Sequence, residues 1–182
     1  MHSQGGSLMD DSILLKRRLI NAKQLSSLMQ LIPFLNNKQV KSIRAFLKEQ
    51  YGFSAELDYQ FLLSNKDNLY AINKDIEKID LNDTRVNSLG LYMGEMKQDV
   101  LRLSMEGAQL VGPHAKKNIL DIGRDQLRSW MKGEDLVMKQ TEVNDMRDFV
   151  LLRHDDDIVG CGKMKEGKVL NFVPKTRRVS LL

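Results

Sequence analysis

Between residues 38 and 51 the apolar positions follow the rhythm of a helix. They recur every three or four residues and form one apolar stripe, at Val40, Ile43, Phe46, Leu47 and Tyr51. Asn36 or Asn37 can cap the start of this helix, and Gly52 can end it in a left-handed conformation. The pattern therefore predicts a helix over residues 38–51.

The residues before this helix carry a weaker pattern. Residues 1–11 are small and polar, without periodicity, so we expect a disordered lead. Residues 12–35 hold apolar side chains near helical spacing until Pro33 interrupts them, which predicts an N-terminal helix. Its basic cluster at 16–18 either faces solvent or touches an anionic surface such as RNA.

After Gly52 the rhythm changes to short apolar runs separated by Asn, Asp, Ser and Gly. The runs at 57–63, 69–72 and 86–93 predict strands, with a hairpin-like turn at 65–68 between the first two. The acid-rich segment 75–83 is expected to form a short helix with a loop. These elements predict an α+β half that ends near residue 96.

Residues 101–117 are expected to link this half to a second module. Ser104 can cap a short helix that ends at the Gly112-Pro113 pair. The cations that follow, Lys116 and Lys117, form a small basic cluster with His114. A single His beside two lysines is typical of polar surface, with phosphate binding as the alternative.

The second module, residues 118–182, begins with a short strand at 118–123. Residues 124–133 predict a helix with Leu127, Trp130 and Met131 on one face and a glycine at its end. Trp130 occupies a core position in this pattern, and stacking against a base is the other interpretation.

The last part of the chain predicts three strands. Residues 149–153 and 158–164 form a hairpin around the polar turn 154–157, and residues 168–173 add a third strand after a Glu-Gly turn. The third strand runs into a Pro-Lys-Thr-Arg-Arg tail, so apolar pairing positions and cationic surface come from the same stretch.

Charge sharpens the interest in this stretch. The chain has a net charge of +4, whereas residues 160–182 alone carry six basic residues and one acidic residue, a net charge of +5. Positive charge concentrated on an otherwise neutral protein is the footprint of a phosphate-backbone partner. A solvated basic tail is the alternative.

Composition excludes several classes of protein. A single cysteine, Cys161, permits neither an intramolecular disulfide nor a cysteine zinc cluster, and it fits a reducing, cytoplasmic setting. No stretch approaches the roughly 20 apolar residues of a membrane span, and residues 1–10 lack the apolar centre of a signal peptide. We expect a cytoplasmic protein with no membrane partner and enough apolar residues for packed cores.

The sequence contains no phosphate loop, no G-x-G-x-x-G after a strand and no H-E-x-x-H, so the usual machinery of three enzyme classes is missing. Cys161 sits in an apolar strand, which indicates a structural thiol, whereas a nucleophile needs a base within reach. His154 and the three aspartates after it suggest a metal site or, alternatively, a solvated turn. We predict a protein that is not an enzyme, with no cofactor and no metal.

The order of strand, helix ending in glycine, strand, Asp-rich turn, glycine-containing strand and basic closing strand resembles a PUA domain, a small RNA-binding pseudo-barrel, over residues 118–179. The tail 168–178 also resembles the PUA-like C-terminal domain of Sun-type RNA cytosine-C5 methyltransferases. Residues 36–117 resemble the pre-PUA α+β half of archaeal relatives of the Nip-seven ribosome-biogenesis factor. Residues 1–35 have no counterpart in this pattern.

The resemblance implies an α+β fold in which N-terminal helices and a pre-PUA α+β half precede a small PUA-like β pseudo-barrel. It implies RNA binding by the second half, while the first half packs against it or docks a protein partner. The family's helix-ending glycine corresponds to Gly133, and its glycine-flanked strand to Gly160, Cys161 and Gly162. Glycines there permit close approach of a strand or of a sugar-phosphate backbone.

We therefore predict an RNA-binding protein that recognises structured RNA, rRNA or tRNA, in RNA maturation or ribosome biogenesis. The predicted RNA-binding residues come from the cluster at the junction and from the basic C-terminal stretch: Lys116, Lys117, Lys163, Lys165, Lys168, Lys175, Arg177 and Arg178. Two alternatives stay open. The chain is an RNA-targeting module or stand-alone relative of an RNA cytosine-C5 methyltransferase system, or it is an adaptor whose basic tail binds an acidic protein.

Overall fold

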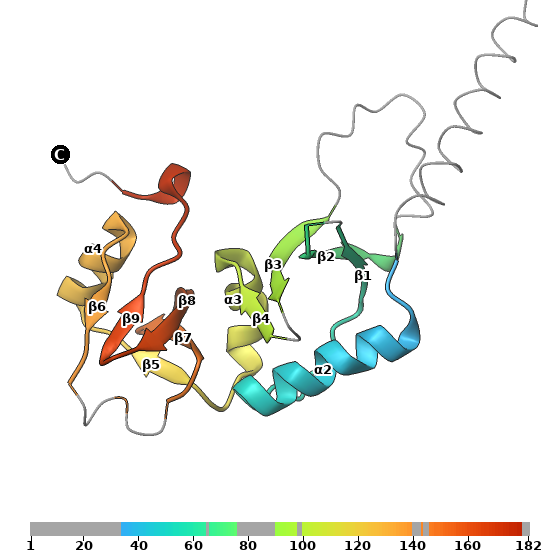
Figure 1. Cartoon of the computed structure of the whole chain (residues 1–182), viewed down its shortest axis with the longest axis horizontal. Coiled ribbons are helices and arrows are strands. Elements are labelled where there is room, and N and C mark those ends of the chain that lie inside the picture. The colour runs from blue at the N-terminus through green and yellow to red at the C-terminus, as the bar shows by residue number, and fades with distance from the viewer. Residues whose placement is uncertain are drawn as a thin grey trace, which may run out of the picture.

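A computed structural model of the chain describes residues 34–64, 66–75, 90–97, 100–139, 143 and 146–179. The expected disordered lead, nearly all of the N-terminal helix and all but the first residue of the acid-rich segment lie outside these ranges. The described residues form an α+β fold with two sheets, as predicted (Figure 1). None of their helices is long and apolar enough to span a membrane.

The first described helix is α2, Asn37–Tyr51. Asn36 caps it through a reciprocal pair of hydrogen bonds with Gln39, and Gly52 ends it at a φ of 62°. These local interactions satisfy backbone groups at both helix ends. The predicted helix and its ending glycine are confirmed.

The first sheet is an antiparallel meander whose strands lie in chain order. The strands are β1 Tyr59–Leu63, β2 Asn68–Asn73, β3 Leu91–Lys97 and β4 Val100–Leu103. The predictions for β1 and β2 are confirmed. The expectation that the linker begins at residue 101 is wrong, because β4 pairs with β3 and buries Leu101 and Leu103 in the core.

The helix α3, Met105–Val111, lies between the two sheets and contacts both β3 and a strand of the second sheet, β8, Asp157–Lys165 (Figure 1). The Ser104 hydroxyl caps it, as expected, by accepting a hydrogen bond from the Gly107 amide at 2.9 Å. Gly107 has no room for a side chain, because a Cβ would collide with the Met93 carbonyl. The predicted linker is therefore a packed layer of the protein, followed by the 3-10 turn η2, Gly112–His114.

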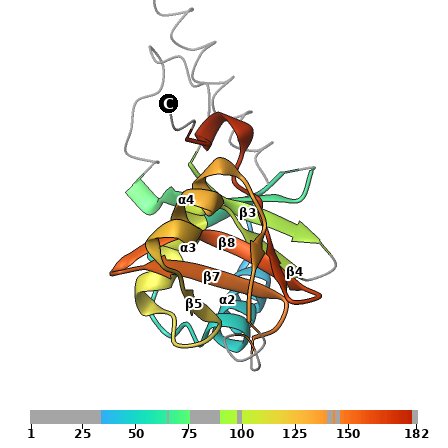
Figure 2. The same ribbon diagram turned by 90° about the vertical axis from the view of Figure 1, so that its left-hand side faces the viewer.

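The second sheet has the order β5-β7-β8-β9-β6, with β5 parallel to β7 and the other pairs antiparallel. The strands are β5 Ile119–Asp121, β6 Leu136–Val137, β7 Phe149–His154, β8 Asp157–Lys165 and β9 Lys168–Leu170. The helix α4, Arg124–Lys132, covers one of its faces. Figure 2 views the molecule from this side, with α2 behind the sheet.

The β7–β8 hairpin is the wall between two cores. Side chains on one face, including Leu151 and Cys161, join the core of α2 and the first sheet. Side chains on the other face, including Val150 and Leu152, join the core beneath α4. A strand buried on both faces reads as a continuous apolar run, which is why residues 149–152 lack polar positions.

The third strand, predicted at residues 168–173, is shorter in the structure. The prediction that the basic tail forms a closing strand is wrong. β9 ends at Leu170, and the tail turns into a 3-10 helix, η3, Lys175–Arg177. The Asn171 side chain donates to the Trp130 and Glu134 carbonyls, 2.8 and 3.1 Å away, which holds the chain against the end of α4. Pro174 follows and has no amide proton to offer a ladder.

Candidate nucleic-acid interface

Three lysines lie on one face of the β8–β9 hairpin, and we call them the lysine hairpin: Lys163, Lys165 and Lys168. Lys163 and Lys165 are two residues apart on β8, and Lys168 pairs directly with Lys165 across the turn. Glu166 and Gly167 form that turn with φ values of 50° and 74°, the backbone geometry that favours tight hairpins. Like charges opposite each other repel, so this end of the hairpin is a favourable place for an anion.

The tail cations divide into two kinds. The Arg177 guanidinium donates to Glu106 of α3 at 2.7 Å. The Arg178 guanidinium donates to the Val173 carbonyl at 3.1 Å and covers Gly133, which ends α4 with a φ of 89°. Both arginines thus anchor the tail. Lys175 is exposed and has no ion pair among the described residues.

Lys116 and Lys117 lie elsewhere. Their backbone amides donate to the Tyr51 carbonyl at 2.7 and 3.0 Å, so this segment closes the C-terminal end of α2. In Figure 1 the yellow segment that joins η2 to β5 lies at the bottom, whereas η3, in dark red, lies at the top. The structure therefore separates the predicted RNA-binding residues into three groups.

Gly160 and Gly162 lie beneath Trp130. A Cβ on Gly160 would be 3.0 Å from the indole nitrogen, and one on Gly162 would be 3.0 Å from the far edge of the ring. Trp130 is fully buried and donates to the Val159 carbonyl at 3.3 Å, so its ring is not available to stack on a base. Close packing against Trp130 accounts for Gly160, and close packing against Val169, the Leu170 carbonyl and Trp130 accounts for Gly162.

The polar residues considered for catalysis have structural partners. Burial raises the pKa of the Cys161 thiol to about 11, and its sulfur lies 3.7 Å from the Tyr51 hydroxyl, whose pKa burial also raises. Only 4% of Cys161 is exposed. His154 Nδ1 lies 2.8 Å from the Ile122 carbonyl oxygen, and the described residues contain no cluster of metal-ligating side chains. A neutral, buried thiol is a poor nucleophile at neutral pH.

Sequence reasoning missed a cationic stripe on α4. Arg124, Arg128 and Lys132 are spaced by four residues and are exposed, so they line one face of the helix. Because α4 covers the other face of the sheet, this stripe and the lysine hairpin lie on opposite sides of β8. The spacing of the three cations was the signal that could have identified it.

Sequence reasoning also missed a groove between the two sheets, which we call the junction groove. It consists of two cavities of about 170 and 310 Å³ that share Arg102 and Phe172. The Arg102 guanidinium carbon lies 4.6 Å from the centre of the Phe172 ring, and the Phe149 ring lies 6.3 Å from it. No local signal marks this groove, because its rings and cations come from β3, β4, α4, β7, β8 and the tail.

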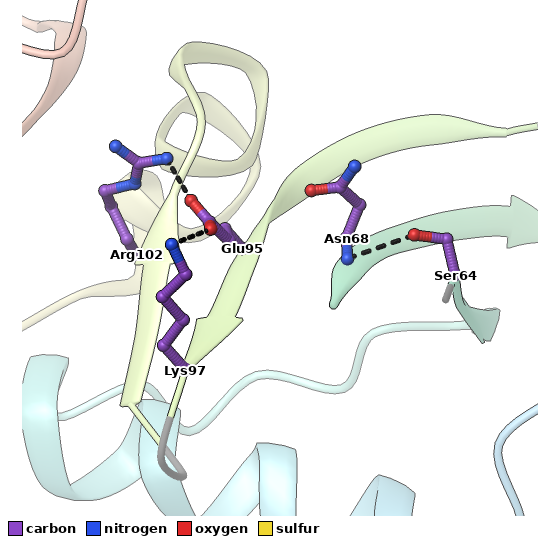
Figure 3. Close-up of polar contacts among 5 residues, drawn as sticks. All are labelled: Ser64, Asn68, Glu95, Lys97 and Arg102. Carbon is purple, nitrogen blue, oxygen red and sulfur yellow. Dashed lines mark hydrogen bonds and ion pairs between the residues drawn. The ribbon is translucent and has the colours of Figure 1, made fainter. Parts of the chain in front are cut away.

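A carboxylate organises the first-sheet side of this groove. Arg102 and Lys97 both point at Glu95 and form ion pairs with it (Figure 3). The hydrogen bond from Lys97, with help from Arg102, lowers the pKa of Glu95. On the same sheet, the backbone N–H of Asn68 donates to the Ser64 hydroxyl at 3.2 Å and tightens the β1–β2 turn (Figure 3). The ion pair with Glu95 and the contact with the Phe172 ring give the Arg102 guanidinium a defined position.

Known proteins resemble this chain in a consistent way. Residues 117–179 match the family model of the PUA domain of methyltransferase RsmF. Ribosomal RNA small subunit methyltransferase F of Vibrio vulnificus is 23% identical over 158 residues, which cover 86% of this chain and 32% of the relative. The protein of the same name from Vibrio cholerae is 22% identical over 140 residues, with 77% and 28% covered.

These matches confirm the predicted PUA-like domain of the Sun-type methyltransferases. The family model covers the PUA domain and no catalytic domain. The chain spans about a third of the length of the curated relatives it matches. An alignment of 158 residues is longer than residues 117–182, so the first half also resembles these methyltransferases. Its resemblance to relatives of the Nip-seven factor, and the domain division at residue 117, stay predictions.

Proposed function

We propose that this chain is an RNA-binding part of the machinery that matures ribosomal RNA, and that the lysine hairpin contacts the phosphates of a structured RNA. The observation that carries the proposal is that the segment matching the PUA domain contains every charged residue of the stretch of net charge +5. The relatives' names favour small-subunit rRNA over tRNA as the target. Such a role belongs in the cytoplasm.

The hairpin geometry suits a phosphate. Lys165 and Lys168 repel each other across the turn, and an anion between them would relieve that repulsion. Lysine contacts of this kind neutralise the backbone and fix register without reading sequence. Recognition then depends on shape and on 2′-OH contacts, which suits structured RNA better than duplex DNA.

We further propose that the chain targets RNA for a methyltransferase rather than catalysing methyl transfer. The supporting observations are that the matching family model describes a PUA domain and that Cys161 is a buried thiol with a raised pKa. Incubation of the chain with a small-subunit rRNA fragment and labelled S-adenosylmethionine is expected to leave the RNA unlabelled. Incorporation of the label would contradict this part of the proposal. In the adaptor alternative the basic tail binds an acidic protein, and a protein partner on the first half is a separate proposal.

The RNA proposal is tested by titrating fluorescent small-subunit rRNA stem-loops with the chain at several salt concentrations and following anisotropy. Replacing Lys163, Lys165 and Lys168 together with Ala is expected to weaken binding about tenfold or more and to flatten the salt slope by about three. The matched control replaces three exposed lysines of α2, Lys38, Lys41 and Lys48, and changes the net charge equally.

Equal losses in the hairpin variant and the α2 control would show that net charge alone drives binding and would overturn the hairpin as a site. A third variant, Arg124→Ala with Arg128→Ala and Lys132→Ala, tests the stripe on α4. If that variant loses affinity and the hairpin variant does not, the RNA lies on the opposite side of the sheet.

A further inference from the structure

We infer that the junction groove holds one unpaired nucleotide of the bound RNA, with its base stacked on the Arg102–Phe172 pair. This inference rests on the proposed RNA binding and adds a preference for an unpaired position. Unpaired bases are commonly recognised by stacking on aromatic rings and on guanidinium planes.

The groove offers a stacking surface in an unusual place. Phe172 is 36% exposed although it is a large aromatic residue, and it lies just before the tail turns away along η3. The Arg102 guanidinium lies over its ring. Arg102 and Phe172 thus form a stacked pair that lines both cavities. A base can extend this stack.

The stacking surface is held in place before a ligand arrives. Glu95 accepts a hydrogen bond from Arg102 and pairs with Lys97, so the guanidinium is fixed from its edge (Figure 3). The Phe172 ring supports the face of the guanidinium. A side chain that is already ordered loses little conformational freedom on binding. The pair is therefore suited to a flat, neutral ligand.

The charges favour a nucleotide over an acidic peptide. The Glu95 carboxylate is paired with two cations, and Glu106 is paired with Arg177. Asp148 lines the edge of the larger cavity beside Lys163, which has no ion pair among the described residues. One unpaired lysine fits one phosphate, and the rest of the groove fits an uncharged ring.

The position of Lys163 joins the groove to the lysine hairpin. Lys163 lines the larger cavity, pairs with Phe149 across the sheet and shares its face with Lys165. A backbone that follows the hairpin therefore passes the mouth of the groove. Cavities of about 170 and 310 Å³ lie at or below the size of drug-sized sites, about 300–1,000 Å³, which suits one nucleotide.

The test compares two RNA stem-loops that differ only in one bulged nucleotide, with 2-aminopurine at the bulge. The full chain is expected to prefer the bulged RNA by about tenfold and to quench the probe on binding. Phe172→Leu is expected to remove the preference and the quenching while keeping the affinity for the paired RNA and the salt slope. Val137→Ala, an exposed apolar position on β6, is the control.

Arg102→Lys keeps the charge, removes the guanidinium plane and is expected to reduce the preference too, so the inference stays testable if Phe172→Leu unfolds. If the parent and both variants prefer the bulged RNA equally, the inference that a base stacks in the groove is overturned, whereas the RNA-binding proposal is unaffected. A different outcome would also overturn the inference: the parent does not quench the probe, and an excess of an acidic protein removes its preference for the bulged RNA. The groove would then be a site for a protein partner. Failure of the parent to bind either RNA would overturn the proposed function itself.

Discussion

The two halves of the molecule build their cores differently. The second half has a core made wholly of its own residues, beneath α4 and around Trp130. The first half completes its core with residues of the β7–β8 hairpin, among them Phe149, Leu151 and Ile158. The first half thus depends on the second for its interior, and β8, which carries two lysines of the proposed RNA face, also belongs to the hairpin on which the first half packs.

The strongest test of this comparison uses two neighbouring leucines. Leu151 and Leu152 are both fully buried, but Leu151 faces the shared core and Leu152 faces the core beneath α4. Each Leu→Ala change is expected to lower the free energy of unfolding by about 2–5 kcal/mol. Denaturant unfolding followed by circular dichroism and by Trp130 fluorescence measures both halves.

Because the hairpin is common to both cores, the two signals are expected to change together in both variants. Separate transitions in Leu151→Ala, with Trp130 fluorescence unchanged until higher denaturant, would mean that the halves unfold independently. That result would contradict the statement that the first half depends on the second for its core.

A smaller effect is expected from Gly162→Ala, which adds a methyl group within the core of the second half. The new Cβ would meet Val169, the Leu170 carbonyl and the Trp130 ring. Overpacking of this kind costs about 1–3 kcal/mol, measured as a lower melting temperature with a shifted Trp130 emission. An unchanged melting temperature would show that Val169 and the tryptophan can move aside.

Ser104→Ala sharpens the comparison at the layer between the halves. The Ser104 hydroxyl accepts from the Gly107 amide at 2.9 Å and donates to the Tyr92 carbonyl at 2.6 Å. Loss of this cap is expected to cost about 1 kcal/mol. Ser42→Ala on exposed α2 is the control, because its hydroxyl only donates back to Lys38 within the helix, and it is expected to be nearly neutral.

The smallest effect concerns pH at the edge of the second sheet. Arg153 donates to Asp121 at 2.6 and 3.0 Å, and these hydrogen bonds lower the pKa of Asp121. A carboxyl group with a lowered pKa stabilises the folded protein at pH values above its ordinary pKa. That stability is lost as the pH falls through the lowered pKa. Asp121→Asn is expected to melt slightly below the parent at pH 7 and equally at strongly acidic pH. A constant difference at all pH values would exclude the ion pair as the cause.

Elements with strong local signals were predictable. The cap at Asn36, the glycine after Tyr51, the cap at Ser104 and the apolar run at 149–152 each depend on neighbours in the chain. Trp130 was assigned to a core because its helix carries other apolar side chains on the same face. In these places the interactions that decide the structure lie within a few residues.

The errors have a common physical cause. Residues 100–103 are a strand because β3 offers a free edge to pair with, and the tail turns at Lys175 because Asn171 reaches back to α4. Both partners are distant in the sequence, so no local pattern predicts them. The cations were counted correctly as a charged stretch, yet their separation into free lysines and anchored arginines depends on Glu106 and Gly133.

By itself, the sequence determined that this protein has an α+β fold with a PUA-like second half and positive charge concentrated near its end. Periodicity, caps and net charge are local or additive properties, and they survive without knowledge of the fold. Only the tertiary structure decided that the β7–β8 hairpin serves two cores, that the lysine hairpin and the stripe on α4 face opposite ways, and that Arg102 meets Phe172. Those outcomes depend on contacts between residues distant in the chain, which packing selects and sequence spacing does not encode.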